Sequence, residues 1–194
     1  MKSWLIPVLI ILGVVTVGTV YLSNNYLKNV SSPPTKVNLP QTTTIPSVQA
    51  TLTLEPATTT INKGDKSTYT VKLVSENTKA VAVETHFTFD PQVIKILSLE
   101  PGTLLPEPQE LLRVIDTNKG TLAYALGTLK PTLATTDIVF TIHFEALTSS
   151  SNLKPPLVFD QTQTTVALTP ASTNTPYTAD QITLLFKEQP LTIL

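Results

Sequence analysis

Apolar and polar side chains alternate with a period of two through most of residues 50–194. The alternation is longest in residues 81–89 and 138–146, where every second position is apolar or threonine. Successive side chains of a β-strand point to opposite faces of its sheet, so this period indicates strands that are packed on one face only. Shorter alternating runs cover residues 52–54, 69–73, 111–116 and 121–126. Such strands are typical of antiparallel sheets, and we therefore expect an all-β domain.

Turn-forming residues lie between these runs. They cluster at residues 62–65, 100–102 and 117–120, and the last cluster separates two strand candidates in the manner of a β-hairpin. The 34 threonines of the chain favour the same fold class, because a β-branched side chain suits strands better than helices. We expect about nine strands in two sheets, and residues 50–194 are numerous enough to bury a core without disulfides.

The amino-terminal segment has a different character, because residues 4–22 carry no charge. As a helix this run would extend about 28 Å, which is close to the hydrocarbon thickness of a bilayer. The alternative is a cleaved signal peptide, but the run is longer than a typical signal sequence core and no small-x-small motif follows it. We expect one transmembrane helix over residues 4–22, single-pass in the cell membrane, with the C-terminal domain extracytoplasmic.

Residues 23–49 separate this segment from the alternating part of the chain. They hold four prolines and a run of three threonines, and their apolar residues follow no period. Such a segment cannot bury enough surface to offset the entropy lost on ordering. We expect a disordered Pro/Thr-rich linker that holds the domain of residues 50–194 away from the membrane.

Charge and composition exclude several classes of function. Residues 50–194 contain all 14 acidic residues against nine lysines and Arg113, so the domain has no basic surface for a nucleic acid. The chain has no cysteine, which removes disulfides, thiolate metal sites and cysteine nucleophiles. It contains no G-x-S-x-G, no H-E-x-x-H and no glycine-rich phosphate loop. We therefore expect no enzyme activity and no cofactor.

Four sequence pieces, taken in order, resemble the cohesin domain. An I-N-K-G-D turn before a strand begins at Ile61, and F-T-F-D-P at residues 87–91 precedes an apolar run and P-G-T-L at residues 101–104. G-T-L-A-Y-A at residues 120–125 and the long strand of residues 137–147 follow. The resemblance implies a jelly-roll β-sandwich that recognises a protein partner, since cohesins bind dockerin modules and so gather glycan-degrading enzymes.

The resemblance also implies where the partner would bind. Cohesins bind through the outer face of one sheet, and the strand before F-D-P belongs to that sheet. Its outward positions are Ala82, Glu84, His86 and Thr88. Glu84 lies six residues before the aspartate, where cohesins often have an acidic contact, whereas Ala82 replaces the polar residue that is common two positions earlier.

Arg113 and two histidine–glutamate pairs are further candidates. Arg113 shares one expected strand face with Leu111 and Ile115, and it could either contribute to an interface or be an ordinary surface residue. Glu84 and His86, together with His143 and Glu145, could form a zinc site only if their strands were neighbours. The cohesin arrangement puts the two strands in different sheets, so we expect no metal site.

These observations lead to one expected function and two alternatives. We expect a membrane-anchored, extracytoplasmic cohesin-like module that docks a dockerin-like protein. A carbohydrate-binding module of the same fold is the first alternative, although Tyr177 is the only aromatic residue of the domain expected to be exposed. A structural or adhesion module of the cell envelope is the second.

Overall fold

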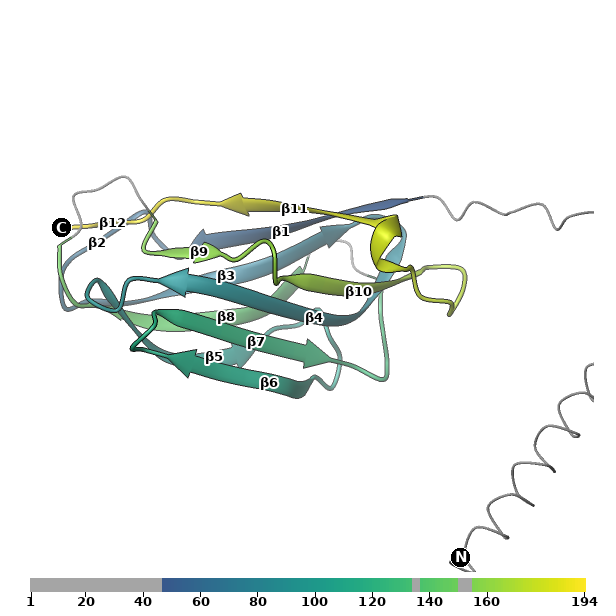
Figure 1. The fold of residues 1–194 in the computed structure, drawn as a ribbon, viewed down its shortest axis with the longest axis horizontal. Helices are drawn as coiled ribbons and strands as arrows, with labels where there is room; N and C mark the ends of the chain where they lie inside the picture. The colour runs from purple at the N-terminus through teal and green to yellow at the C-terminus, as the bar shows by residue number, and fades with distance from the viewer. Residues whose placement is uncertain (1–46, 134–136, 150–154) are drawn as a thin grey trace, which may run out of the picture. The chain divides into compact units, whose positions relative to one another are not determined.

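The computed structural model describes residues 47–133, 137–149 and 155–194. These residues form a β-sandwich (Figure 1) with one short 3₁₀ helix, η1 (Ala179–Gln181). The strands are β1 (Val48–Pro56), β2 (Thr60–Ile61), β3 (Lys66–Ser75), β4 (Thr78–Phe89), β5 (Ile94–Pro101), β6 (Gln109–Asp116), β7 (Thr121–Gly127), β8 (Asp137–Ala146), β9 (Leu157–Phe159), β10 (Thr165–Pro170), β11 (Ile182–Glu188) and β12 (Thr192–Ile193).

Two five-stranded sheets form the layers of the sandwich. One, which we call the back sheet, has the strand order β11-β1-β3-β8-β5. The other, the front sheet, has the order β10-β4-β7-β6, and β9 also pairs with β4. Strand β1 runs parallel to β11, whereas the other pairs within these two sheets are antiparallel. The expected all-β sandwich is therefore confirmed.

The described residues form twelve strands, whereas about nine were expected, and nine of the twelve have six or more residues. The other three, β2, β9 and β12, have only two or three residues and were not expected. Strand β1 begins at Val48, two residues before the expected domain boundary. The transmembrane helix expected at residues 4–22, and the linker as far as residue 46, lie outside the described residues. Within the described part of the chain, no helix is long and apolar enough to cross a membrane.

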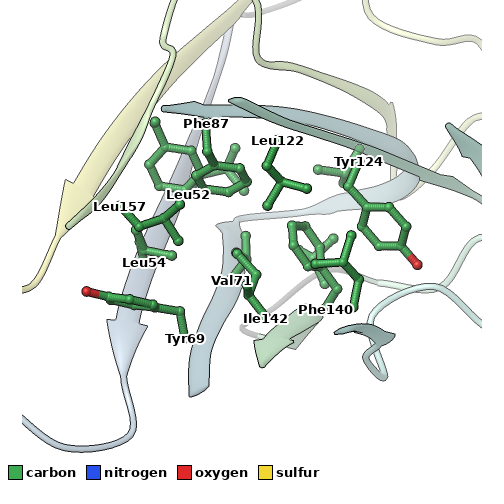
Figure 2. Packing of buried hydrophobic residues seen from close by; sticks show 14 of the residues in the cluster. Leu52, Leu54, Tyr69, Val71, Phe87, Leu122, Tyr124, Phe140, Ile142 and Leu157 are labelled. Atoms are coloured by element: carbon green, nitrogen blue, oxygen red, sulfur yellow. The ribbon is translucent and has the colours of Figure 1, made fainter. Parts of the chain in front are cut away.

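The core lies between the two sheets and is rich in aromatic rings (Figure 2). Phe140 of β8 makes edge contacts with Phe87 of β4 and Tyr124 of β7, at centroid distances of 6.3 and 4.9 Å. Tyr69 of β3 stacks on Phe144 at 5.1 Å. These residues occupy alternate positions of their strands, so the sequence period that predicted the strands also fills the core. The opposite side of each strand is left free to face outward.

The hairpin expected around residues 117–120 joins β6 to β7. The Asp116 carboxylate accepts hydrogen bonds from the backbone N–H groups of Asn118 and Lys119, both at 3.0 Å, and these bonds hold the pKa of Asp116 below its ordinary value. Gly120 closes the turn with a φ of +64°. The turn therefore fixes the register of the two strands that form one margin of the front sheet.

Candidate functional site: the front face

The outer side of the front sheet, which we call the front face, is built from alternate residues of its strands. Strand β4 contributes the four expected positions, because the residues between them are buried in the core. The front-face residues of β4 are Ala82, Glu84, His86 and Thr88, and those directly opposite on β7 are Gly127, Ala125, Ala123 and Thr121. No side chain of this β7 row is larger than threonine, so the middle of the front face is low, and Ala125 and Gly127 are themselves buried within it.

The sequence pattern alone did not single out the β7 row. Residues 121–126 were predicted as a strand, and their small outward residues Ala123 and Ala125 gave no chemical signal. Only the pairing with β4 places these residues beside Glu84 and His86. Small residues at alternate positions of a strand were the one signal that could have indicated a close-approach surface.

Glu84 and His86 contact each other on this surface. Nε2 of His86 lies 2.8 Å from Oε1 of Glu84, and the two side chains are 21% and 44% exposed. The residues are two apart on one strand and therefore lie on the same face, as the alternation predicted. The pair gives a part of the front face that otherwise has only alanine, glycine and threonine one carboxylate and one imidazole.

The backbone N–H and C=O groups of His86 on β4 bond to a turn and not to a neighbouring strand. Strand β10 pairs with residues 78–84 and β9 with residues 87–89. Between them, Oγ1 of Thr164 accepts a hydrogen bond from the His86 backbone N–H at 3.0 Å, and the Asp160 backbone N–H donates to the His86 carbonyl at 2.7 Å. The candidate surface is therefore continuous along the whole of β4.

An apolar margin borders the flat region along β6. Leu111 and Val114 are 63% and 49% exposed, and Leu112 and Val114 lie opposite Ala125 and Ala123. Contiguous exposed apolar residues are typical of surfaces that bind a partner. Uninterrupted alternation predicts Leu111 on the same face as Arg113, and this prediction is wrong because β6 contains a β-bulge at Leu111.

Arg113 does not lie on the front face with the other four candidates. It pairs with Tyr124, whose side chain is buried in the core, so Arg113 points to the inner side at the margin of the sandwich. Its guanidinium lies 5.3 Å from the centre of the Tyr124 ring and donates to the Glu110 carboxylate at 2.6–3.0 Å. These hydrogen bonds from Arg113 hold the pKa of Glu110 below its ordinary value.

The two histidine–glutamate pairs lie on different sheets, as expected. His143 belongs to β8 of the back sheet, where its Nε2 lies 3.3 Å from Oε2 of Glu100. Glu84 and His86 belong to β4 of the front sheet. Among residues 47–133, 137–149 and 155–194, no group of three potential metal ligands comes together.

Tyr177 lies away from the front face, in the connection between β10 and β11. It lines a pocket of about 440 Å³ together with residues of β1 and of the β3–β4 turn. The polar lining residues include Gln49, Glu76 and Asn77. Tyr177 was expected to be exposed, but it is half-buried and packs against the core.

Solved cohesins share this architecture. The type II cohesin A11 of Bacteroides cellulosolvens is similar with a TM-score of 0.59, at 12% identity over 74% of this chain and 99% of that one. A type II cohesin–X-dockerin complex from Acetivibrio cellulolyticus gives 0.56, at 16% identity over 75% and 99%. The seventh ScaB type I cohesin of Pseudobacteroides cellulosolvens gives 0.55, at 10% identity over 75% and 92%.

At identities this low, the structural similarity establishes the fold alone. The family is assigned by the match of the sequence to a family model. No curated protein matches the chain. The family model described as "Cohesin domain" matches residues 50–184, which include β3 to β10 and most of β1. The match covers well over half of the chain. The chain therefore belongs to the cohesin domain family.

Proposed function

We propose that this cohesin module docks a dockerin-type protein through its front face. The observation that carries the proposal is the combination of a flat alanine and glycine row on β7 with the exposed apolar margin on β6. A flat surface allows a rigid element of the partner, such as a helix, to approach the sheet closely. The apolar margin gives that partner surface to bury, and burial of apolar surface drives most protein association.

The Glu84–His86 pair would give the complex its orientation. Charged groups across an interface contribute more to specificity and register than to total affinity. A partner that presents a donor to Glu84 would be favoured over one that presents a carboxylate. The solved relative from Acetivibrio cellulolyticus is a complex with an X-dockerin, which supports a dockerin as the class of partner. The proposal includes no catalytic step.

The proposal extends to the placement of the module. Residues 4–22 would anchor the chain in the membrane, and residues 23–46 would serve as a spacer for the extracytoplasmic domain. A tether of this kind raises the local concentration of whatever the domain binds at the membrane. The support for this part is the uncharged run and the Pro/Thr-rich composition that follows it.

A binding experiment with matched variants tests the proposed face. The full chain, immobilised in mild detergent, is titrated with a panel of type I and type II dockerin modules that includes the X-dockerin of Acetivibrio cellulolyticus. For a dockerin that binds, we expect A125R on the front face to weaken binding by about a hundredfold, because a long charged side chain fills the flat row. T70R is the control, since Thr70 is an outward residue of the central back-sheet strand β3.

If no dockerin of the panel binds, or if A125R and T70R weaken binding equally, the front face is not a dockerin site. Circular dichroism of both variants controls for folding.

The same detergent preparation is also titrated with cellohexaose and xylohexaose, because the Tyr177 pocket favours glycan binding as a second candidate. Saturable binding of either oligosaccharide that is lost in Y177A would establish that function.

A further inference from the structure

The edge strand β6 contains one residue more than its partner strand. Glu110 pairs with Leu126 and Leu112 pairs with Ala125, so Leu111 has no partner on β7. This is the geometry of a β-bulge, which reverses the side-chain alternation of the strand on one side of the extra residue. The bulge therefore decides which side chains of β6 point toward the core and which point to the front face.

The bulge brings Glu110 and Arg113 to the same side of the sheet. In an unbroken strand, residues three apart point to opposite faces. Here Glu110 pairs with the buried Leu126 and Arg113 with the buried Tyr124, so both point inward. Nε and an Nη of Arg113 then donate to the two Glu110 carboxylate oxygens at 2.6–3.0 Å. An ion pair with this geometry cannot form unless the bulge is present.

Two further groups hold this ion pair at the margin of the sandwich. The Tyr124 hydroxyl donates to Oε2 of Glu110 at 3.2 Å. The guanidinium of Arg113 also lies 3.5 Å from the Leu99 carbonyl oxygen of β5, the edge strand of the other sheet. Strands β5 and β6 follow the same margin of the domain (Figure 1). Arg113 is thus held by groups from both sheets while it holds Glu110.

The same bulge turns Leu111 outward onto the front face. A Cβ atom added at Gly127 would lie 3.0 Å from Cδ1 of Leu111, so the leucine side chain occupies the space that a larger residue on β7 would take. Gly127 is in the front-face row opposite Ala82. Leu111 nevertheless remains 63% exposed. It therefore forms a raised apolar group at one end of a flat surface.

We infer that Arg113 is a positioning residue of the docking surface. Its ion pair with Glu110 stabilises the β-bulge that places Leu111 over Gly127, and Leu111 anchors the partner. The affinity part of this inference rests on the proposed function, whereas the positioning part concerns the free chain alone. Arg113 itself does not contact the partner. This differs from the interface role that its sequence neighbours suggested.

The positioning part is tested without any partner. In the full chain with labelled leucine methyl groups, we expect a nuclear Overhauser effect between the Leu111 methyls and the Gly127 Hα protons. R113M should reduce this signal at least twofold, because the ion pair is lost while an unbranched apolar side chain is kept at this position. K95M, which removes a charge from the neighbouring edge strand β5, should leave it unchanged. An undiminished signal in R113M overturns the inference.

Charge reversal distinguishes the ion pair from a general loss of packing. E110R and R113E should each weaken the Leu111–Gly127 signal, and the double variant E110R/R113E should restore most of it. If the double variant is as impaired as the single ones, the ion pair does not position Leu111. This comparison remains informative if R113M lowers the overall stability of the domain.

The affinity part is tested with the dockerin that binds the unmodified chain best. We expect L111A and R113M each to weaken binding by about tenfold. The double variant L111A/R113M should bind no more weakly than L111A alone, because Arg113 acts through Leu111. Additive losses would overturn the inference by showing that Arg113 contacts the partner directly. If A125R abolishes binding and L111A does not weaken it, the proposed face stands and the anchor role of Leu111 is wrong.

Discussion

Gly120 occupies a position in the β6–β7 turn that no other residue fills without strain. Its φ is +64°, and a Cβ atom there would lie 2.2 Å from the Phe89 carbonyl oxygen. The Phe89 backbone N–H also donates to the Gly120 carbonyl oxygen at 2.8 Å, so the two backbones are in close contact. We expect G120A to lower the free energy of unfolding by roughly 2–4 kcal/mol, because it adds a backbone clash to an unfavourable φ. Urea denaturation of the two chains measures the difference.

Gly64 provides the matched control for this substitution. Its φ is +87°, but a Cβ atom there would have no neighbour within 4 Å. We expect G64A to cost about 1 kcal/mol, since only the backbone conformation is penalised. If G64A and G120A were equally destabilising, the contact with Phe89 would have no energetic role.

Glu110 should report the state of its ion pair through its titration. The hydrogen bonds from Arg113 lower the pKa of Glu110, so the pair stabilises the fold above the ordinary glutamate value of 4.5 and is lost as the pH falls through the lower, folded value. We expect the Glu110 carboxyl carbon signal to titrate with a midpoint below 4.5, and the midpoint to rise in R113M. A midpoint that does not respond to R113M would show that the ion pair is absent in solution.

Among the elements, β4 and β8 are the ones that the sequence predicts best. Both are long, and their buried residues recur at every second position from Val83 to Phe89 and from Phe140 to Ala146, so the hydrophobic period identifies the strands and these parts of their inner faces. The period also predicted that Val81 and Ile138 point inward, but Val81 is only half-buried and Val139 is buried in place of Ile138. The outward orientation of the four β4 residues Ala82, Glu84, His86 and Thr88 is predicted correctly for this reason. The β6–β7 hairpin is predicted as well, because a turn rich in asparagine and glycine separates its two strands.

The sequence predicts β6 as a strand but not the face of Leu111, because the geometry at this residue depends on residues that are distant in the sequence. Uninterrupted alternation puts Leu111 and Arg113 on one face. The bulge separates them, and it is fixed by contacts with Tyr124 and Leu99, which are near Arg113 only in the folded chain. The short strands β2, β9 and β12 are missed for a similar reason, since two or three residues carry no period.

The turn between β9 and β10 can be tested as an element of the front sheet. We expect T164V to remove the hydrogen bond that the His86 backbone N–H donates to Thr164, at a cost of about 1 kcal/mol. Hydrogen exchange of the His86 amide should accelerate, while the amides of β7 keep their protection. T162V is the control, because Thr162 is exposed and bonds only within the turn. Unchanged exchange at His86 would show that the turn does not complete β4.

The two sheets unfold together if the aromatic core couples them. Phe140 of the back sheet contacts Phe87 and Tyr124 of the front sheet, so its truncation removes contacts on both sides. We expect F140A to lower the free energy of unfolding by about 3–5 kcal/mol in a single transition. L97A, at a leucine that is 39% exposed on an edge strand, should cost less than about 1 kcal/mol. Two separate transitions in F140A would show that the sheets are independent folding units.

The alanine and glycine row on β7 has a consequence for how partner choice could change during evolution. These side chains have no rotamers to lose, so immobilising them in a complex costs no side-chain entropy. The ordering cost of association then falls almost entirely on the incoming molecule and on the few long side chains at the rim. New preferences would accordingly arise through substitutions at that rim or in the incoming molecule, while the smooth centre persists as a shared platform.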